Sequence, residues 1–344
     1  MLKALHKTAK FIDQYMVIFL ILFIIGGITF GSTFPAQAKG LKSYTTVTLF
    51  FMLYPMMIGL SIEQLGKALG NLKLISWSMI FNFLLSPLLA AGLAYLFLHH
   101  SPEFAVGLIL TGTVPCAGMV AGWTGYAKGN VALALIIVVL SLLVSIVMIP
   151  IWMPILAGAY VSIDALGMLR EIFFAVVIPL ILGNLTRRFI FSKWGQDGFQ
   201  KIKPILPAVL MLGMFWIVFI SMALEAKSVL QNPQYVLIIF IPLFFFYTIL
   251  FISSVAFSKW MKFTYGDMVA FVYGTAGKNI SIALALAALF FSPLTVLVLA
   301  LKPIIQIGFM ATFLRILPKT VKWFSRQTAP VDQAVAIPNR QSAD

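Results

Sequence analysis

Long apolar stretches recur along almost the whole chain, and short polar segments separate them. About twenty apolar residues are needed to cross the hydrocarbon core of a bilayer as a helix. Ten stretches meet this length, and they cover residues 15–34, 44–62, 74–98, 104–126, 131–156, 165–184, 205–224, 235–257, 268–291 and 294–317. The pattern predicts an all-α membrane protein of ten transmembrane helices, followed by a polar tail over residues 318–344.

Composition and charge distribution agree with this interpretation. Of the 344 residues, 61% are hydrophobic and only 10% are charged, whereas soluble domains carry about a quarter charged residues. If the N-terminus is cytoplasmic, the inside segments hold eighteen of the Lys and Arg residues, and the outside loops hold only Lys39, Lys42, Arg170 and Lys227. This asymmetry predicts a multi-pass protein of the cytoplasmic membrane with both termini inside. The net charge of +14 is therefore explained by anchoring in the lipid bilayer, and we do not expect nucleic acid as a partner.

The two halves of the chain have matching patterns of apolar stretches. Five stretches fall within residues 1–160 and five within residues 161–317, so the fourth stretch corresponds to the ninth. An odd number of helices in each half places the two copies in opposite orientations, and such inverted repeats are typical of secondary transporters. The alternative is that any ten evenly spaced helices divide into two sets.

Helix-breaking residues interrupt the fourth and ninth stretches at corresponding places. The fourth contains Gly112, Thr113, Pro115, Cys116 and Gly118, and the ninth contains Gly274, Thr275, Gly277, Lys278 and Asn279. Proline removes a backbone donor and glycine loosens a helix. We expect breaks at Pro115, Gly118, Gly274 and Gly277, with the two helices crossing at a solute site in mid-membrane. The alternative is that these small residues only allow close helix packing.

Lys278 lies near the centre of its apolar stretch. A lysine at the bilayer centre costs at least about 2.5–3.5 kcal/mol on insertion scales, so it needs a partner or a function. It is predicted either to attract an anion or to relay a proton. Lys302, one residue before Pro303 in the tenth stretch, raises the same question. The alternative for both lysines is that the side chain extends to a membrane interface.

Carboxylates are missing from the centres of the apolar stretches, because all ten Asp and Glu residues fall in loops, tails or helix ends. A carboxylate proton relay is thereby excluded, and a bound cation would have only carbonyl oxygens as ligands. The single cysteine and three histidines show no metal-ligand spacing. The sequence predicts neither a metal site nor a cofactor, and no motif of an intramembrane enzyme is present.

The remaining candidate site residues are polar groups within apolar stretches. Cys116 follows a helix-breaking proline, and thiolates bind soft species well, although a lone cysteine also serves as a small buried hydrophobe. Asn82 and Asn279 are expected to line a cavity or to bond across helices. Thr113 and Thr275 are expected to donate or accept hydrogen bonds at the crossing.

Ordered motifs in the first half resemble a known family. They are Leu53-Tyr54-Pro55, Glu63-Gln64-Leu65-Gly66, Asn82 with Pro87, Pro102-Glu103-Phe104 and Pro115-Cys116-Ala117-Gly118. Together they resemble the arsenical-resistance (arsenite efflux) carriers of the bile acid:sodium symporter superfamily. In the second half, Gly277-Lys278-Asn279 is more similar to the ninth helix of the bile acid:sodium symporters. The resemblance implies a panel domain and a core domain, crossing fourth and ninth helices, and a functional role for Cys116.

The chain departs from both branches of this superfamily. Arsenite carriers have an acidic residue shortly after the ninth-helix asparagine, where this chain has Ile280-Ser281-Ile282. Bile acid symporters bind sodium with a Ser-Asn pair in the fourth helix and with Glu and Gln in the ninth. The corresponding positions here are Val120-Ala121, Gly274 and Lys278. The resemblance therefore implies altered coupling, with Lys278 standing where a cation would sit.

These observations predict a secondary transporter that works by alternating access. The expected function is efflux of arsenite or a similar small oxyanion, bound by Cys116, Lys278, Asn279, Thr113, Thr275 and Asn82. An organic-anion carrier with altered or absent sodium coupling is the first alternative, and a passive channel is the second. The sequence does not specify the transport direction, the coupling ion or the oligomeric state.

Overall fold

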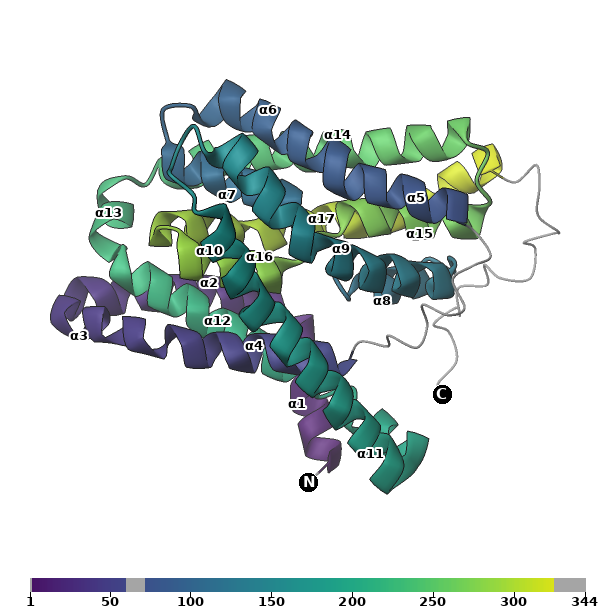
Figure 1. The fold of residues 1–344 in the computed structure, drawn as a ribbon, viewed down its shortest axis with the longest axis horizontal. Coiled ribbons are helices and arrows are strands. Elements are labelled where there is room, and N and C mark those ends of the chain that lie inside the picture. Colours follow the sequence, from purple (N-terminus) through teal and green to yellow (C-terminus); the bar gives the residue numbers. More distant parts are fainter. Residues whose placement is uncertain (1, 60–71, 325–344) are drawn as a thin grey trace, which may run out of the picture.

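The computed structural model describes residues 2–59 and 72–324, and this part of the chain is helical without any β-strand. Three predicted features lie outside the described residues: the end of the second apolar stretch at 60–62, the Glu63-Gln64-Leu65-Gly66 motif, and the tail after residue 324. Many helices run along the long axis of the molecule, whereas α11 crosses it obliquely (Figure 1). An all-α fold is therefore confirmed for the described chain.

Within residues 2–59 and 72–324, six helical segments are long and apolar enough to cross a membrane. They are α2 (Met16–Thr33), α5 (Leu72–Ile80) continued through the π-turn η3 (Phe81–Leu85) into α6 (Ser86–Leu98), α9 (Val131–Ala157), α12 (Leu206–Leu224), α14 (Tyr235–Trp260) and the first part of α17 (Pro293–Phe324). Each corresponds to one predicted apolar stretch. The chain is thus a multi-pass membrane protein.

The fourth and ninth apolar stretches are each divided into two helices. The fourth forms α7 (Pro102–Thr113) and α8 (Val120–Tyr126), and the ninth forms α15 (Tyr265–Ala276) and α16 (Ile280–Phe290). Short non-helical segments separate the members of each pair. The predicted interruptions are therefore present.

The sixth apolar stretch continues as helix well beyond its predicted end at residue 184. It comprises α10 (Ala165–Ile172), the π-turn η4 (Phe173–Val177) and α11 (Ile178–Ile202). The apolar pattern ends at Arg187 and Arg188, but helical backbone does not require apolar side chains. A change of direction comes only at Gly195, where φ is +66°, a left-handed conformation that glycine adopts without steric cost.

The remaining helices are α1 (Leu2–Gln14), α3 (Pro35–Gly40), the 3-10 turn η1 (Leu41–Tyr44), α4 (Thr45–Gly59) and α13 (Ala226–Gln231). Two groups of helices can be distinguished by their contacts. In the first group, α12 packs against α2 and α4, and α4 packs against α11. In the second, α6, α7, α9, α14, α15 and α17 pack against one another. Helix α12 also contacts α16 and α17, and so connects the groups (Figure 1).

Glycines allow the helices of the first group to approach closely. A Cβ atom on Gly213 of α12 would lie 2.8 Å from the backbone nitrogen of Met52 in α4, and one on Gly31 of α2 would overlap the carbonyl oxygen of Ala223. Association of helices in lipid depends on such close packing, because apolar side chains gain little by leaving the hydrocarbon. These glycines therefore fix the spacing of the group.

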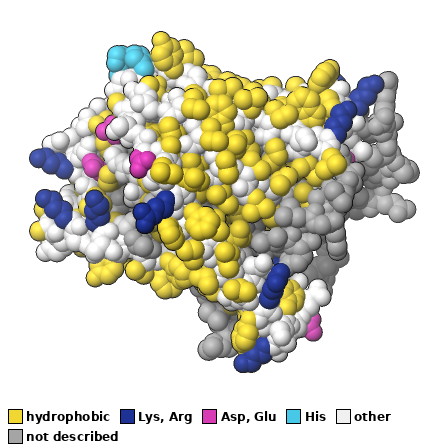
Figure 2. All heavy atoms as spheres, viewed as in Figure 1, with side chains coloured by type: hydrophobic (Ala, Val, Ile, Leu, Met, Phe, Trp, Pro, Cys, Tyr) yellow, Lys and Arg dark blue, Asp and Glu magenta, His cyan; other side chains and the backbone are white. Residues whose placement is uncertain are grey.

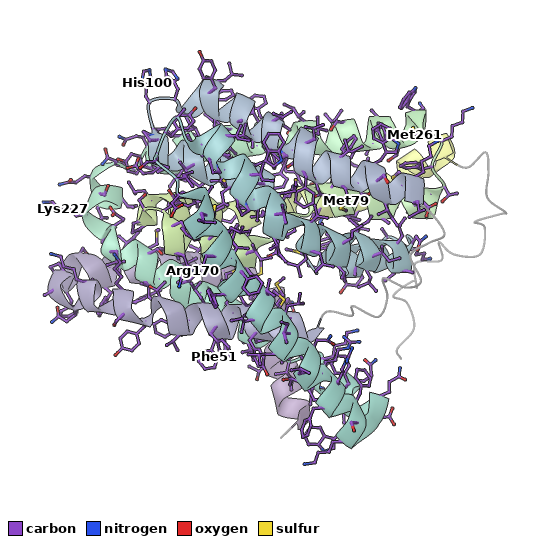
Figure 3. The ribbon with its side chains drawn as sticks, in the orientation of Figure 1. Phe51, Met79, His100, Arg170, Lys227 and Met261 are labelled. Carbon is purple, nitrogen blue, oxygen red and sulfur yellow. The ribbon has the colours of Figure 1, made fainter. Side chains whose placement is uncertain are left out.

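Apolar side chains cover the middle of the molecular surface, and Lys and Arg lie toward its ends (Figure 2). Large apolar side chains such as Ile18, Phe51 and Ile252 are exposed, which suits contact with lipid. His100 and Lys227 lie at the end opposite Met261 (Figure 3). The loops before and after α14 are therefore on opposite sides of the apolar region, as a membrane-spanning helix requires.

We expect Gly31→Ala to destabilise the protein, because the added methyl overlaps backbone atoms of α12. Overpacking of this kind costs about 1–3 kcal/mol. Gly26→Ala is the matched control in the same helix, since its Cβ would lie 3.6 Å from the Phe219 ring, an ordinary contact. The apparent midpoint of thermal unfolding in detergent measures the effect. Equal midpoints for the two variants would contradict the proposed packing.

Candidate functional site

The two interrupted helices meet at their breaks. Cys116, between α7 and α8, and Lys278, between α15 and α16, form an antiparallel β-bridge. The backbone N–H of Ala117 donates to the Gly277 carbonyl at 2.7 Å, and that of Asn279 donates to the Pro115 carbonyl at 2.8 Å. Unwound backbone inside a membrane protein must find partners within the protein. Each break here supplies the hydrogen-bond partners that the other lacks.

Local sequence explains where the helices stop. Pro115 lacks an N–H and disfavours helical backbone in the residue before it, and Val114 is accordingly extended, with ψ at 153°. In the other break, Asn279 is extended and caps α16, because its Oδ1 accepts the backbone N–H of Ile282 at 3.0 Å. The positive end of the α16 dipole therefore lies at the crossing.

Lys278 is fully buried beside Asn82 of η3. Its Nζ donates to the Asn82 side-chain Oδ1 at 3.0 Å and lies 3.3 Å from the Asn82 backbone carbonyl oxygen. The Asn82 amide nitrogen in turn donates to the carbonyls of Ser78, at 2.9 Å, and Gly274, at 3.0 Å. Asn82 thus connects η3, α15 and the buried ammonium group.

The π-turn explains why the Asn82 carbonyl is available to Lys278. The Ser86 N–H bonds to the Phe81 carbonyl, five residues earlier, instead of the Asn82 carbonyl that an α-helix would use. The next residue, Pro87, has no N–H to donate. The Asn82 carbonyl therefore has no partner in its own helix and accepts from the lysine.

Cys116 is buried, with 1% of its surface exposed. Its backbone N–H donates to Ser141 Oγ of α9 at 3.1 Å, and its Sγ lies 3.7 Å from the Ala117 carbonyl oxygen. The thiol therefore faces the protein interior in this conformation. Ser141 was not predicted as a site residue. A polar serine within the long apolar stretch of α9 could have indicated that its hydroxyl has a partner in the protein interior.

Thr113 and Thr275 use their hydroxyls to hold the helix ends. The Thr113 hydroxyl donates to the Leu110 carbonyl at 3.1 Å and lies 3.6 Å from the Met153 sulfur. The Thr275 hydroxyl donates to the Val272 carbonyl at 3.1 Å and lies 2.8 Å from Ser254 Oγ. Both threonines are fully buried. They lie beside the breaks, but their hydroxyls are already hydrogen-bonded to other groups of the protein.

The three glycines among the predicted breaker residues differ in the space around them. A Cβ on Gly277 would overlap Val120, and one on Gly274 would lie 3.0 Å from Ile137. Gly118, by contrast, is exposed, and a Cβ added there would meet no atom of a more distant residue within 4 Å. Close packing therefore accounts for Gly277 and Gly274, whereas Gly118 lies at an open edge of the crossing.

The buried charges are all positive where side chains are described. Lys278 and Lys302 have 0% exposure, and no Asp or Glu side chain of the described part is buried. Neither lysine reaches an interface, so the alternative that they extend to the membrane surface is wrong. Among the described residues, no group of three or more His, Cys, Asp or Glu side chains is placed to hold a metal ion.

Comparisons with known proteins connect this geometry with transport. Residues 46–232 match the profile of a family described as the Sodium Bile acid symporter family. The chain is 25% identical to the arsenical-resistance protein Acr3 of Alkaliphilus metalliredigens, over 92% of this chain and 95% of Acr3. It is 23% identical to an uncharacterized transporter of Synechocystis, over 93% and 91% of the two chains. It is also 26% identical to YocS of Bacillus subtilis, named as an uncharacterized sodium-dependent transporter, over 85% and 87%.

We expect Gly277→Ala to disrupt the crossing, since the added methyl overlaps Val120 and lies 2.7 Å from the Tyr273 carbonyl oxygen. The cost should again be about 1–3 kcal/mol. Gly118→Ala is the control within the same crossing and should be neutral. Thermal unfolding midpoints of the two variants test this. An unchanged unfolding midpoint in Gly277→Ala would mean that Val120 and the backbone beside Gly277 can move aside, and would contradict the close packing at the crossing.

Proposed function

The chain belongs to the sodium bile acid symporter family, a family of transporters and not of enzymes, and on that premise we propose that it exports arsenite or a similar small oxyanion. Transport takes place across the cytoplasmic membrane by alternating access. The observation that carries this proposal is the pairing of two interrupted helices around a buried lysine. In transporters built from repeats, solute sites lie where such helices meet at mid-membrane.

The proposed topology has ten spans in two inverted repeats, over residues 1–160 and 161–317, with the tail at 318–344 and both termini cytoplasmic. The α7–α8 and α15–α16 pairs are then the broken fourth and ninth spans. The α4 helix and the α10–η4–α11 segment are the second and sixth. The distribution of Lys and Arg residues supports this orientation.

Lys278 takes the place of a bound cation in the proposed mechanism. Its ammonium group lies against two oxygens of Asn82, which are groups that also suit a metal cation. As long as the lysine is protonated, it supplies a covalently attached positive charge at the crossing. Transport should therefore not require external sodium, and release and uptake of the lysine proton would provide coupling to a proton gradient.

The solute is proposed to approach the open edge of the crossing at Gly118. Asn279 is paired with Pro115 through its backbone, and its Nδ2 is 3.7 Å from the sulfur of Met56 in α4. Asn279 would donate hydrogen bonds to an oxyanion there. Cys116 is buried in the present conformation, so we propose that its thiol meets the solute when the two helix groups separate. Thr113 and Thr275 would bind the solute only if they exchange their present partners.

An organic-anion carrier is the second candidate. It is supported by the match to YocS and by a 28% match over 207 residues to a rice protein named as a probable sodium/metabolite cotransporter. Its substrate would use the same positive charge, whereas a thiol would be dispensable. A passive channel is a third candidate, and it would give ion currents that do not saturate.

Everted membrane vesicles that contain the protein should accumulate arsenite when a proton gradient is imposed. Accumulation should be the same with and without a sodium gradient, because Lys278 substitutes for the cation. Radioactive or mass-spectrometric arsenic measurement after rapid filtration gives the rate. Absence of arsenite accumulation under every gradient would reject arsenite and favour the organic-anion carrier, and dependence on sodium would reject the proposed role of Lys278.

Lys278→Met should reduce the transport rate roughly tenfold or more, because hydrogen bonds to a charged group contribute about 1.5–3 kcal/mol and each 1.4 kcal/mol is a factor of about ten in rate. Lys227→Met, at an exposed position, is the matched control and should transport normally. Cys116→Ser should abolish arsenite transport but spare an organic-anion activity. Full transport with an unchanged pH profile in Lys278→Met and Lys278→Gln would refute both charge roles.

A further inference from the structure

A second buried lysine lies outside the crossing. Lys302 and Gln306 stand one turn apart on α17, and both side chains have 0% exposure. Within the described part of the chain, neither Lys302 Nζ nor Gln306 Nε2 has a hydrogen-bond partner. Two donors on the same face of one helix are therefore left without acceptors in the protein interior.

Tyr247 of α14 fixes the orientation of the glutamine. Its hydroxyl donates to Gln306 Oε1 at 2.6 Å, and Tyr247 is itself fully buried. Because the amide oxygen faces the tyrosine, the amide NH₂ group is the part left unpaired. Buried polar groups are normally satisfied by protein, water or a ligand, so the unpaired donors indicate an acceptor that is not part of the chain.

The charge distribution indicates that this acceptor is negative. Lys278, the other buried lysine, has two oxygens of Asn82 as partners. Lys302 has no such oxygen, and no described carboxylate is buried with it. An unpaired charge in a protein interior carries a large desolvation cost, which a counter-ion would offset.

We propose that Lys302 and Gln306 bind a small inorganic anion of the halide class, such as chloride, between α17 and α14. One ammonium group matches a single negative charge, and the amide NH₂ supplies a second donor. Both side chains are completely buried, so a solute with an organic body is excluded and the ligand has to be a small ion. The site is separate from the crossing and does not depend on which solute is transported.

Thermal unfolding of the purified protein in detergent tests this site. Midpoints are measured by tryptophan fluorescence in sodium chloride or sodium bromide and compared with sodium gluconate at equal ionic strength. Halide should raise the wild-type midpoint saturably, by roughly 2–4 °C at excess concentration. Equal midpoints in halide and gluconate would overturn the proposal and assign the donors to a buried water.

Two substitutions should remove the halide response by different routes. Lys302→Met removes the charge and should fold well, since an apolar side chain of similar volume replaces a buried ion. Gln306→Glu places a carboxylate beside the lysine and so builds the counter-ion into the chain. Its midpoint should be raised and insensitive to halide.

Lys227→Met, at an exposed position, serves as the control and should keep the wild-type halide response, and Lys278→Met tests whether the halide binds at the crossing instead. A response that persists in both Lys302→Met and Gln306→Glu would place the halide elsewhere and refute the proposal. A response lost in Lys278→Met but kept in Lys302→Met would assign the anion to the crossing, which would likewise refute it. Because the readout is stability, failure here leaves the proposed transport activity untouched.

Discussion

The exchange of backbone hydrogen bonds between two interrupted helices is the constraint on which the rest of the structure depends. A single unwound segment inside lipid would leave several donors and acceptors without partners, each at a cost of several kcal/mol. In this chain the segment around Cys116 and the segment around Lys278 satisfy each other. Neither break would be tolerated alone, so the positions of α7, α8, α15 and α16 are determined jointly.

Much of this architecture could be predicted from the sequence, because its causes are local. Apolar stretches have to be long enough to span the bilayer, and proline or closely spaced glycines, as around Pro115 and Gly277, weaken a helix at that place. A lysine at mid-span also had to have a partner. The identity of that partner, Asn82, depends on a contact between residues 196 apart in the chain, and no periodic pattern encodes it. The same applies to Ser141, and to the inward direction of the Cys116 thiol.

The two buried lysines show how similar residues acquire different environments. Lys278 stands where a π-turn followed by Pro87 frees a carbonyl, so its charge is matched by oxygens of the protein. Lys302 stands within α17 immediately before Pro303, and its Nζ has no hydrogen-bond partner in the described part of the chain. The two lysines therefore differ in the oxygens that lie beside the ammonium group, which depends on contacts between distant segments and cannot be read from composition or from position along the chain.

The crossing is held together by main-chain atoms, and this has a consequence for how such carriers diversify. Backbone donors and acceptors are the same whatever side chains flank them, so the Ala117–Gly277 and Pro115–Asn279 pairs impose few demands on chemical identity beyond small size and a proline. Side chains at the crossing are free to change from acid to amide to amine while the scaffold persists. A single substitution there can therefore change the charge of the crossing while the backbone pairing stays the same.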